Sequence, residues 1–100
     1  ILYSGARIDA AEAMRIGLVN RVVAPELLEK EVSALARQLA ENAPLSLAAS
    51  KLAVAAALQD PAERDLEGLL AASQACFNSA DYREGRTAFM EKRRPQFVGR

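Results

Sequence analysis

Apolar residues recur along most of the chain at the spacing of an amphipathic helix. The clearest run is Leu28, Val32, Leu35 and Leu39, whose steps of four, three and four residues place them on one helix face. This pattern predicts a helix over residues 25–40. A proline opens it, and the missing N–H of proline costs nothing at a first helical position.

Three acidic pairs with a spacing of three residues precede other predicted helices. The pairs are Asp9 with Glu12, Asp60 with Glu63, and Asp81 with Glu84. An aspartate before a helix accepts hydrogen bonds from the free N–H groups, while a glutamate three residues later reaches back. We therefore interpret all three pairs as helix caps rather than as acid–base pairs. The first of these helices is expected to end near Gly17, since glycine favours a left-handed helix end.

The fourth predicted helix shows which residues should face inward, and the fifth has one distinct side. On the helix that follows the second acidic pair, these are Leu66, Leu69, Leu70, Ser73 and Phe77. On the final helix, Tyr82, Gly85 and Phe89 lie along one side. Glycine inside a helix costs about 1 kcal/mol relative to alanine, so Gly85 indicates close packing.

Two segments differ from this amphipathic pattern. The helix predicted over residues 44–58 has one charge, Lys51, and its only other polar residues are Ser46 and Ser50. It is either the central helix of a small bundle or a helix buried against another subunit, where its alanines would allow close approach. Residues 18–23 alternate partly and are rich in valine, so they predict a strand or an extended connector. The predicted fold class is mainly α, with five helices and one short extended segment near residues 18–23.

The composition excludes most catalytic and metal chemistry. Apolar residues make up 51% of the 100 residues, but 21 of them are alanine. There is no histidine, so neither a Ser–His or Cys–His pair nor an imidazole metal site can form within this segment. The single cysteine, Cys76, excludes internal disulfides and is expected to be a buried, inert thiol. We predict no catalytic residue and no metal ligand in this chain.

The formal net charge is zero, yet charge is unevenly distributed. Residues 83–100 carry six basic and two acidic side chains, a net of +4. Lys92, Arg93 and Arg94 are consecutive at a predicted helix end, where exposed carbonyl groups favour cations. Alternatively, one or two of them form an anion site. A helical adaptor or nucleic-acid-binding protein that uses this tail is a further hypothesis, but the zero net charge and the lack of an aromatic platform oppose it. We predict no nucleic-acid partner.

Cellular location is indicated by what the sequence lacks. No apolar run approaches the roughly 20 residues of a membrane span, and no signal peptide opens the chain. We therefore predict no membrane partner and a cytoplasmic location, in which a single unpaired cysteine is ordinary. The first residue is isoleucine rather than methionine, which indicates a piece of a longer protein.

Three blocks of the sequence resemble one known family. They are SGARIDAAEAMRIGLVNRVV at residues 4–23, ENAPLSLAASKLA at residues 41–53 and SADYREGRTAFMEKRRPQFVGR at residues 79–100. In this order they resemble the C-terminal part of the crotonase superfamily, the enoyl-CoA hydratase/isomerase family. The resemblance implies the helical, trimerisation region of the crotonase/ClpP-like α/β spiral fold. Residues 1–100 would form one helical domain, and the catalytic α/β core would precede it.

The resemblance also implies an activity for the parent protein. Crotonases act on acyl-CoA thioesters and stabilise a thioester enolate with two backbone N–H groups, while their acid–base residues lie in the core. The parent is expected to be an enoyl-CoA hydratase of fatty-acid or related acyl-CoA metabolism, which adds water to a 2-enoyl-CoA. It would need no cofactor besides the coenzyme A thioester that is its substrate. An enoyl-CoA isomerase, another crotonase-family enzyme and a non-catalytic helical oligomerisation module are the alternatives.

The parts that fall on this chain are oligomer formation and one ligand contact. The resemblance implies a homo-oligomer, a trimer or a dimer of trimers, and a fragment that is inactive alone. In similar hydratases the lysine of the final AFMEKR block meets the phosphorylated adenosine end of a neighbouring subunit's coenzyme A, and that position is Lys92. Phe89, one turn earlier, would lie near the acyl or adenine region. Ser73 stands where the family often has an aromatic residue, so the acyl pocket is expected to differ.

Overall fold

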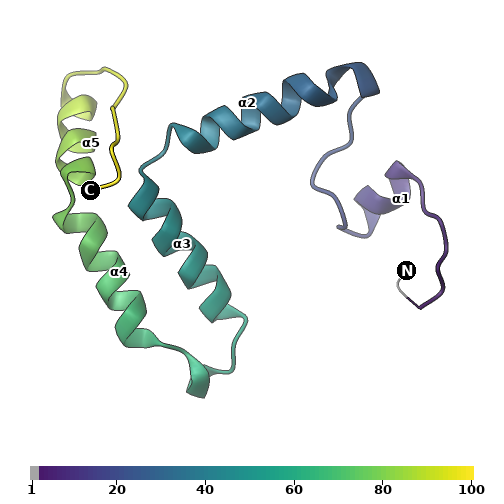
Figure 1. Ribbon diagram of the computed structural model, residues 1–100, viewed down its shortest axis with the longest axis horizontal. Coiled ribbons are helices and arrows are strands. Elements are labelled where there is room, and N and C mark those ends of the chain that lie inside the picture. The colour runs from purple at the N-terminus through teal and green to yellow at the C-terminus, as the bar shows by residue number, and fades with distance from the viewer. Residues whose placement is uncertain (1–2) are drawn as a thin grey trace. The chain divides into compact units, whose positions relative to one another are not determined.

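The computed structural model describes residues 3–100, which form five α-helices and two short 3₁₀ helices (Figure 1). The α-helices are α1 (Ala10–Arg15), α2 (Leu28–Ala40), α3 (Pro44–Ala57), α4 (Leu66–Asn78) and α5 (Ala80–Met90), and the 3₁₀ helices are Pro25–Leu27 and Pro61–Glu63. The described residues contain no β-strand, so the predicted mainly α fold is confirmed and residues 18–23 are a connector rather than a strand. The chain divides into two compact units, residues 1–34 and residues 35–100.

Helix α1 in the first unit begins where its cap predicts. The Asp9 carboxylate accepts a hydrogen bond from the Glu12 N–H at 2.8 Å. The Glu12 carboxylate binds the Arg15 guanidinium at 2.6 Å instead of reaching back, so only half of the expected capping box forms. Gly17, at φ 75°, follows the end of the helix as expected. Ala13 is buried beneath this turn.

The predicted apolar face of α2 is present but uncovered. Its residues are Leu28, Val32, Leu35 and Leu39, which are 49–57% exposed. The helix begins three residues later than predicted because residues 25–27 form a tighter 3₁₀ turn. An ion pair of 2.6 Å between Arg21 and Glu31 joins the preceding connector to α2.

In the second unit, α3 and α4 run antiparallel and pack along each other (Figure 1). The packed side of α3 carries Leu45, Ala49 and Ala56, of which Ala56 is buried. Its outer side is exposed at Leu47 and Val54. Within the described residues α3 is therefore not the enclosed central helix of a bundle.

The packed face of α4 differs from the one predicted. Small residues, together with Leu69, are its half-buried positions: Gly68, Leu69, Ala72 and Cys76. Of the five residues expected to face inward, only Leu69 does so, while Leu66, Leu70, Ser73 and Phe77 are exposed. Small side chains allow two helix backbones to approach closely, whereas a row of leucines and a phenylalanine holds them apart. Counting large apolar residues therefore identified the wrong side of the helix.

Two of the three predicted caps are also displaced. Asp60 caps the 3₁₀ turn by accepting from the Ala62 N–H at 3.0 Å, and Asp65 caps α4 by accepting from the Gly68 N–H at 2.8 Å. The cap of α5 is Ser79, which accepts from the Tyr82 N–H at 2.9 Å. Asp81 therefore lies inside the first turn of α5 and serves another purpose.

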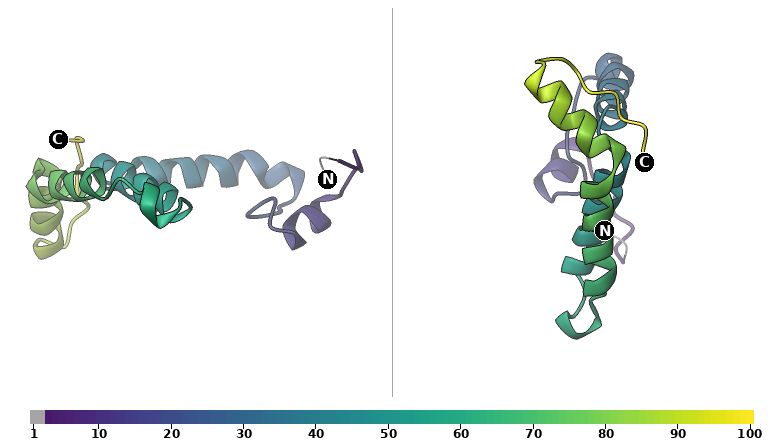
Figure 2. Two further views of the ribbon diagram at one scale, coloured as in Figure 1. Left: turned by 90° about the horizontal axis from the view of Figure 1, so that it is seen from below. Right: turned by 90° about the vertical axis from the view of Figure 1, so that its left-hand side faces the viewer.

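Asp81 binds the C-terminal tail, residues 91–100, which runs back along α5 (Figures 1 and 2). Asp81 is only 2% exposed. Its two carboxylate oxygens accept hydrogen bonds from the backbone N–H groups of Val98, at 2.7 Å, and Gly99, at 2.8 Å. The Ala80 N–H donates to the Arg100 carbonyl at 2.6 Å. These bonds fix the end of the tail beside the start of α5.

Candidate functional site

The two residues predicted to contact a ligand lie together at the C-terminal end of α5. Phe89 is in the last turn and is 82% exposed. Lys92 follows the helix and is exposed, and its N–H donates to the Phe89 carbonyl at 3.2 Å. The structure thus presents one large apolar side chain and one cation at the same exposed helix end.

Lys92 has an unusual backbone conformation, with φ at 54°. Its own hydrogen bond to Phe89 and the 3.0 Å bond from the Arg93 N–H to the Ala88 carbonyl form a Schellman turn, which closes α5. Glycine usually occupies the left-handed position of this turn because a Cβ there costs about 1 kcal/mol. Lys92 is the one non-glycine residue of the described chain with positive φ.

Arg93, the next residue, is held by two carboxylates. Its guanidinium forms a bidentate pair with Glu84, at 2.6 and 3.0 Å, and a further hydrogen bond of 2.6 Å with Glu91. Glu84 also accepts from the Gln96 N–H at 2.8 Å. The Arg93 guanidinium and then the Gln96 N–H lower the pKa of Glu84 from 4.5 to about 2, and the two carboxylates raise the pKa of Arg93. Glu84 and Arg93 therefore remain ionised across the neutral range.

The three consecutive cations therefore have different roles. Arg93 binds Glu84 and Glu91, and Arg94 lies 3.7 Å from the Glu41 carboxylate. Within residues 3–100 Lys92 forms no ion pair. Of the three, Lys92 is the one that can meet an external anion without first losing a carboxylate partner.

A shallow hollow of about 460 Å³ lies next to this helix end. Its lining residues are Arg83, Arg86, Thr87, Met90 and Glu91. Arg86 lies over the Tyr82 ring, with its guanidinium carbon 6.0 Å from the ring centre. The two arginines are three residues apart, a helical spacing that is visible in the sequence and places them on one side of α5. They add positive charge to α5 in the turns that precede Lys92.

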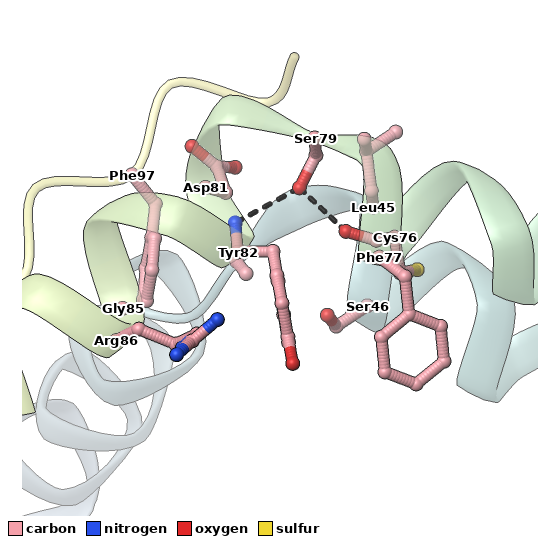
Figure 3. Close-up of a pocket in the computed structure, with 11 residues that line it drawn as sticks. Leu45, Ser46, Cys76, Phe77, Ser79, Asp81, Tyr82, Gly85, Arg86 and Phe97 are labelled. Carbon is pink, nitrogen blue, oxygen red and sulfur yellow. Dashed lines mark hydrogen bonds between the residues drawn. The ribbon is translucent and has the colours of Figure 1, made fainter.

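An apolar pocket of about 380 Å³ lies among α3, α4, α5 and the tail (Figure 3). Figure 3 shows Tyr82 between Phe97 of the tail and Phe77 of α4. The Tyr82 and Phe77 rings meet edge to face, with centres 5.3 Å apart. Cys76 is a lining residue and is half-buried, rather than fully buried as expected. Tyr82 therefore packs against aromatic side chains in the pocket, which is typical of a structural residue.

Ser73 lies on the exposed side of α4, where Phe77 follows one turn later and is 59% exposed. Both residues line a hollow on the α3–α4 pair, together with Ser46 and Ser50. An aromatic side chain is therefore present on this face one turn from the position where the sequence suggested that one was missing.

Residues 3–100 contain neither a cluster of metal ligands nor a membrane-spanning helix. This part of the chain has no group of three or more acidic or cysteine side chains arranged to hold a metal ion. Nor does any of its helices have the length and apolar character needed to cross a membrane.

Comparison with known proteins gives consistent matches over the whole chain. The profile of the enoyl-CoA hydratase/isomerase family matches residues 1–100. The crotonyl-CoA hydratase of Syntrophomonas wolfei is 39% identical over 100 residues, which cover all of this chain and 38% of that protein. The methylmalonyl-CoA decarboxylase of Escherichia coli is 35% identical over 101 residues, which cover 99% of this chain and 39% of that protein.

Solved structures give the same result for the fold. The crystal structure of an enoyl-CoA hydratase/carnithine racemase from Magnetospirillum magneticum has a TM-score of 0.86 and 39% identity to this chain. The match covers 100% of this chain and 37% of that one. The helices match the helical C-terminal region of such structures, and the chain spans somewhat under two fifths of the length of its relatives.

Proposed function

Because the chain belongs to the enoyl-CoA hydratase/isomerase family, within the crotonase superfamily, we propose that it is the C-terminal helical domain of an acyl-CoA enzyme. The observation that carries this proposal is the family match over all 100 residues. The relatives named above include a hydratase and a decarboxylase, both of which are named for CoA substrates. Hydration of a 2-enoyl-CoA is the reaction that we propose for the longer protein, with the coenzyme A thioester as substrate and no further cofactor.

The chain alone is proposed to be inactive. Asp9, Asp60 and Asp65 cap helices, and Asp81 binds the tail. Glu84 is held by Arg93 and has a lowered pKa, the opposite of what a general acid needs near neutral pH. No carboxyl group among these is available for proton transfer to a substrate.

The part assigned to this chain is assembly and one ligand contact. Leu47, Val54, Leu66 and Leu70 are between 41 and 66% exposed, and this large apolar area supports burial against another protein surface. We propose that the surface is buried in a homo-oligomer, a trimer or a dimer of trimers. A non-catalytic oligomerisation module would use the same surface and is the second candidate.

The proposed ligand contact is between Lys92 and the phosphorylated end of coenzyme A, with Phe89 beside it. Support comes from the exposed Phe89 ring, from the lack of an ion pair at Lys92 and from the arginines along α5. Lysine is a compact, multi-donor cation that suits phosphate. The contact persists from ground state to transition state, so it should lower KM without affecting kcat.

Crotonyl-CoA hydration tests the proposal. The 100-residue chain should show no turnover, and the longer protein that contains it should be active. In the longer protein Lys92→Ala should raise KM about tenfold with kcat nearly unchanged. Lys30→Ala is the matched control, because Lys30 is likewise an exposed lysine that forms no ion pair within residues 3–100, and it lies in α2. Lack of activity in the longer protein would favour the non-catalytic module, and unchanged KM and affinity would remove Lys92 from the site.

A further inference from the structure

We propose that Arg93 is a positioning residue, which keeps the Lys92 ammonium available by holding the neighbouring carboxylates of Glu91 and Glu84. This inference rests on the proposed ligand contact of Lys92. It adds a role for three residues that do not themselves meet the ligand.

The turn at Lys92 does not require a lysine. Its two closing hydrogen bonds join backbone groups, from Lys92 to Phe89 and from Arg93 to Ala88. Glycine would form the same bonds without the cost of a Cβ at φ 54°. A lysine differs from a glycine at this position only by its side chain. We therefore attribute the presence of lysine to a ligand that its ammonium group binds.

Two carboxylates lie close enough to Arg93 to be held by it. Glu91 immediately precedes Lys92 in the chain, and Glu84 is on α5. Arg93 binds Glu91 through Nε at 2.6 Å and Glu84 through both terminal nitrogens. The planar guanidinium, with its five N–H donors, can serve both carboxylates at once, which an ammonium group cannot match geometrically.

Because the chain runs Glu91–Lys92–Arg93, the Glu91 carboxylate has a cation at each of the next two positions, and it matters which one it binds. If Arg93 did not hold Glu91, the Glu91 carboxylate would be free to pair with Lys92, the adjacent cation. That internal ion pair would compete with an external phosphate for the Lys92 ammonium group. The Arg93 and Glu84 side chains are 40 and 25% exposed, and that of Glu91 is 56% exposed. Glu91 is the most exposed of the three and hence the freest to change partner.

Binding of coenzyme A to the longer protein, measured by titration calorimetry, tests the proposal through a double-mutant cycle. Lys92→Ala should raise the dissociation constant about tenfold, and Arg93→Gln about threefold to tenfold. In the Lys92→Ala background, Arg93→Gln should change the dissociation constant less than twofold, since Arg93 acts through Lys92. An equal loss in both backgrounds, or no loss from Arg93→Gln alone, would overturn the positioning role.

A rescue experiment separates positioning from a structural role of Arg93. Adding Glu91→Gln to Arg93→Gln removes the competing carboxylate, so affinity should return to within about twofold of the starting protein. A protein weakened only by loss of structure would not recover, since Glu91→Gln restores no contact. Lack of rescue would contradict the proposal even if Arg93→Gln lowered stability.

The same variants distinguish failure of this inference from failure of the proposed function. If Lys92→Ala leaves coenzyme A affinity unchanged, the ligand contact is wrong and the positioning role with it. If Lys92→Ala weakens binding but the effects of Lys92→Ala and Arg93→Gln are additive, only the positioning role is wrong. Arg15→Gln, which breaks a comparable ion pair on α1, should leave the affinity unchanged.

Discussion

Gly85 of α5 faces the ring of Phe97 in the tail, and a Cβ built on Gly85 would lie 3.6 Å from the nearest ring carbon. This is an ordinary van der Waals distance, so the close packing expected from a helical glycine is present but leaves room for a methyl group. We predict that Gly85→Ala raises the free energy of unfolding by about 0.5–1 kcal/mol, because alanine is the better helix former. Urea unfolding measures it, and a loss of stability would show that the ring cannot accommodate the methyl group.

Gly68 in the first turn of α4 should respond differently to the same substitution. A Cβ there would overlap the Asp65 carboxylate, which caps the helix through the Gly68 N–H. The helix-propensity gain of about 1 kcal/mol is then offset by the loss of a cap of similar size, so Gly68→Ala should give no net gain. In an Asp65→Ala background the conflict is absent, and the same change should stabilise by about 1 kcal/mol. Equal effects in both backgrounds would contradict this prediction.

Asp81 should be necessary for the position of the tail. Its buried carboxylate accepts from two backbone N–H groups, and Asp81→Asn would turn an NH₂ group toward one of these donors. A buried donor without an acceptor costs about 1–3 kcal/mol. Hydrogen exchange at the amides of Val98 and Gly99 should therefore accelerate in Asp81→Asn.

The control for the tail is Asp65→Asn at the cap of α4. Asparagine and aspartate are nearly equivalent as caps, so this variant should leave tail exchange and overall stability almost unchanged. Unaltered exchange of the tail amides in Asp81→Asn would show that other contacts hold the tail.

The Glu84–Arg93 pair predicts a specific dependence of stability on pH. The guanidinium and the Gln96 N–H lower the pKa of Glu84 from 4.5 to about 2, so the unfolded chain takes up this proton first as the pH falls. The stabilising contribution is complete above about pH 5 and is lost between about pH 4.5 and pH 2. The difference in thermal midpoint between the native protein and Glu84→Gln should be constant from pH 8 to pH 5 and then shrink. A difference that grows on acidification would have the wrong sign.

The isolated 100-residue chain should self-associate. Among the residues described, the buried apolar ones are Ala13, Ala56 and Ala88, whereas Val54 and Leu70 are 65 and 60% exposed. Sedimentation at high concentration should show species larger than a monomer. Val54→Lys with Leu70→Lys should shift them toward the monomer, and Gln74→Lys, at an exposed polar position of α4, should not. A compact monomer of the native chain would contradict the prediction.

Local sequence signals predicted the helices well but not their partners. The proline at residue 44 and the aspartate at residue 9 identified helix starts, because a cap depends only on neighbouring residues. The packed face of α4 was missed because close approach selects Ala72 and Gly68 over larger apolar residues. The tail contacts of Asp81 and Glu84 join residues 12–18 positions apart, beyond the reach of any capping motif.

At the candidate site the sequence predicted two ligand-contact residues, but not how the neighbouring cations divide their carboxylate partners. Lys92 and Phe89 were identified through a family resemblance, and the structure brings them to one exposed helix end. Three consecutive cations look equivalent in a sequence. Glu84 lies nine residues before Arg93, so its pairing with Arg93 is visible only in the folded chain.

The left-handed backbone at Lys92 has a consequence for protein engineering. A search for stabilising substitutions would rank Lys92→Gly highly, since a Cβ at this left-handed backbone position destabilises the fold by about 1 kcal/mol and glycine has none. The same change deletes the cation that we propose as the ligand contact. A Lys92→Gly variant selected for heat resistance would therefore bind its proposed ligand less tightly. Stability and ligand affinity would have to be screened together at this position.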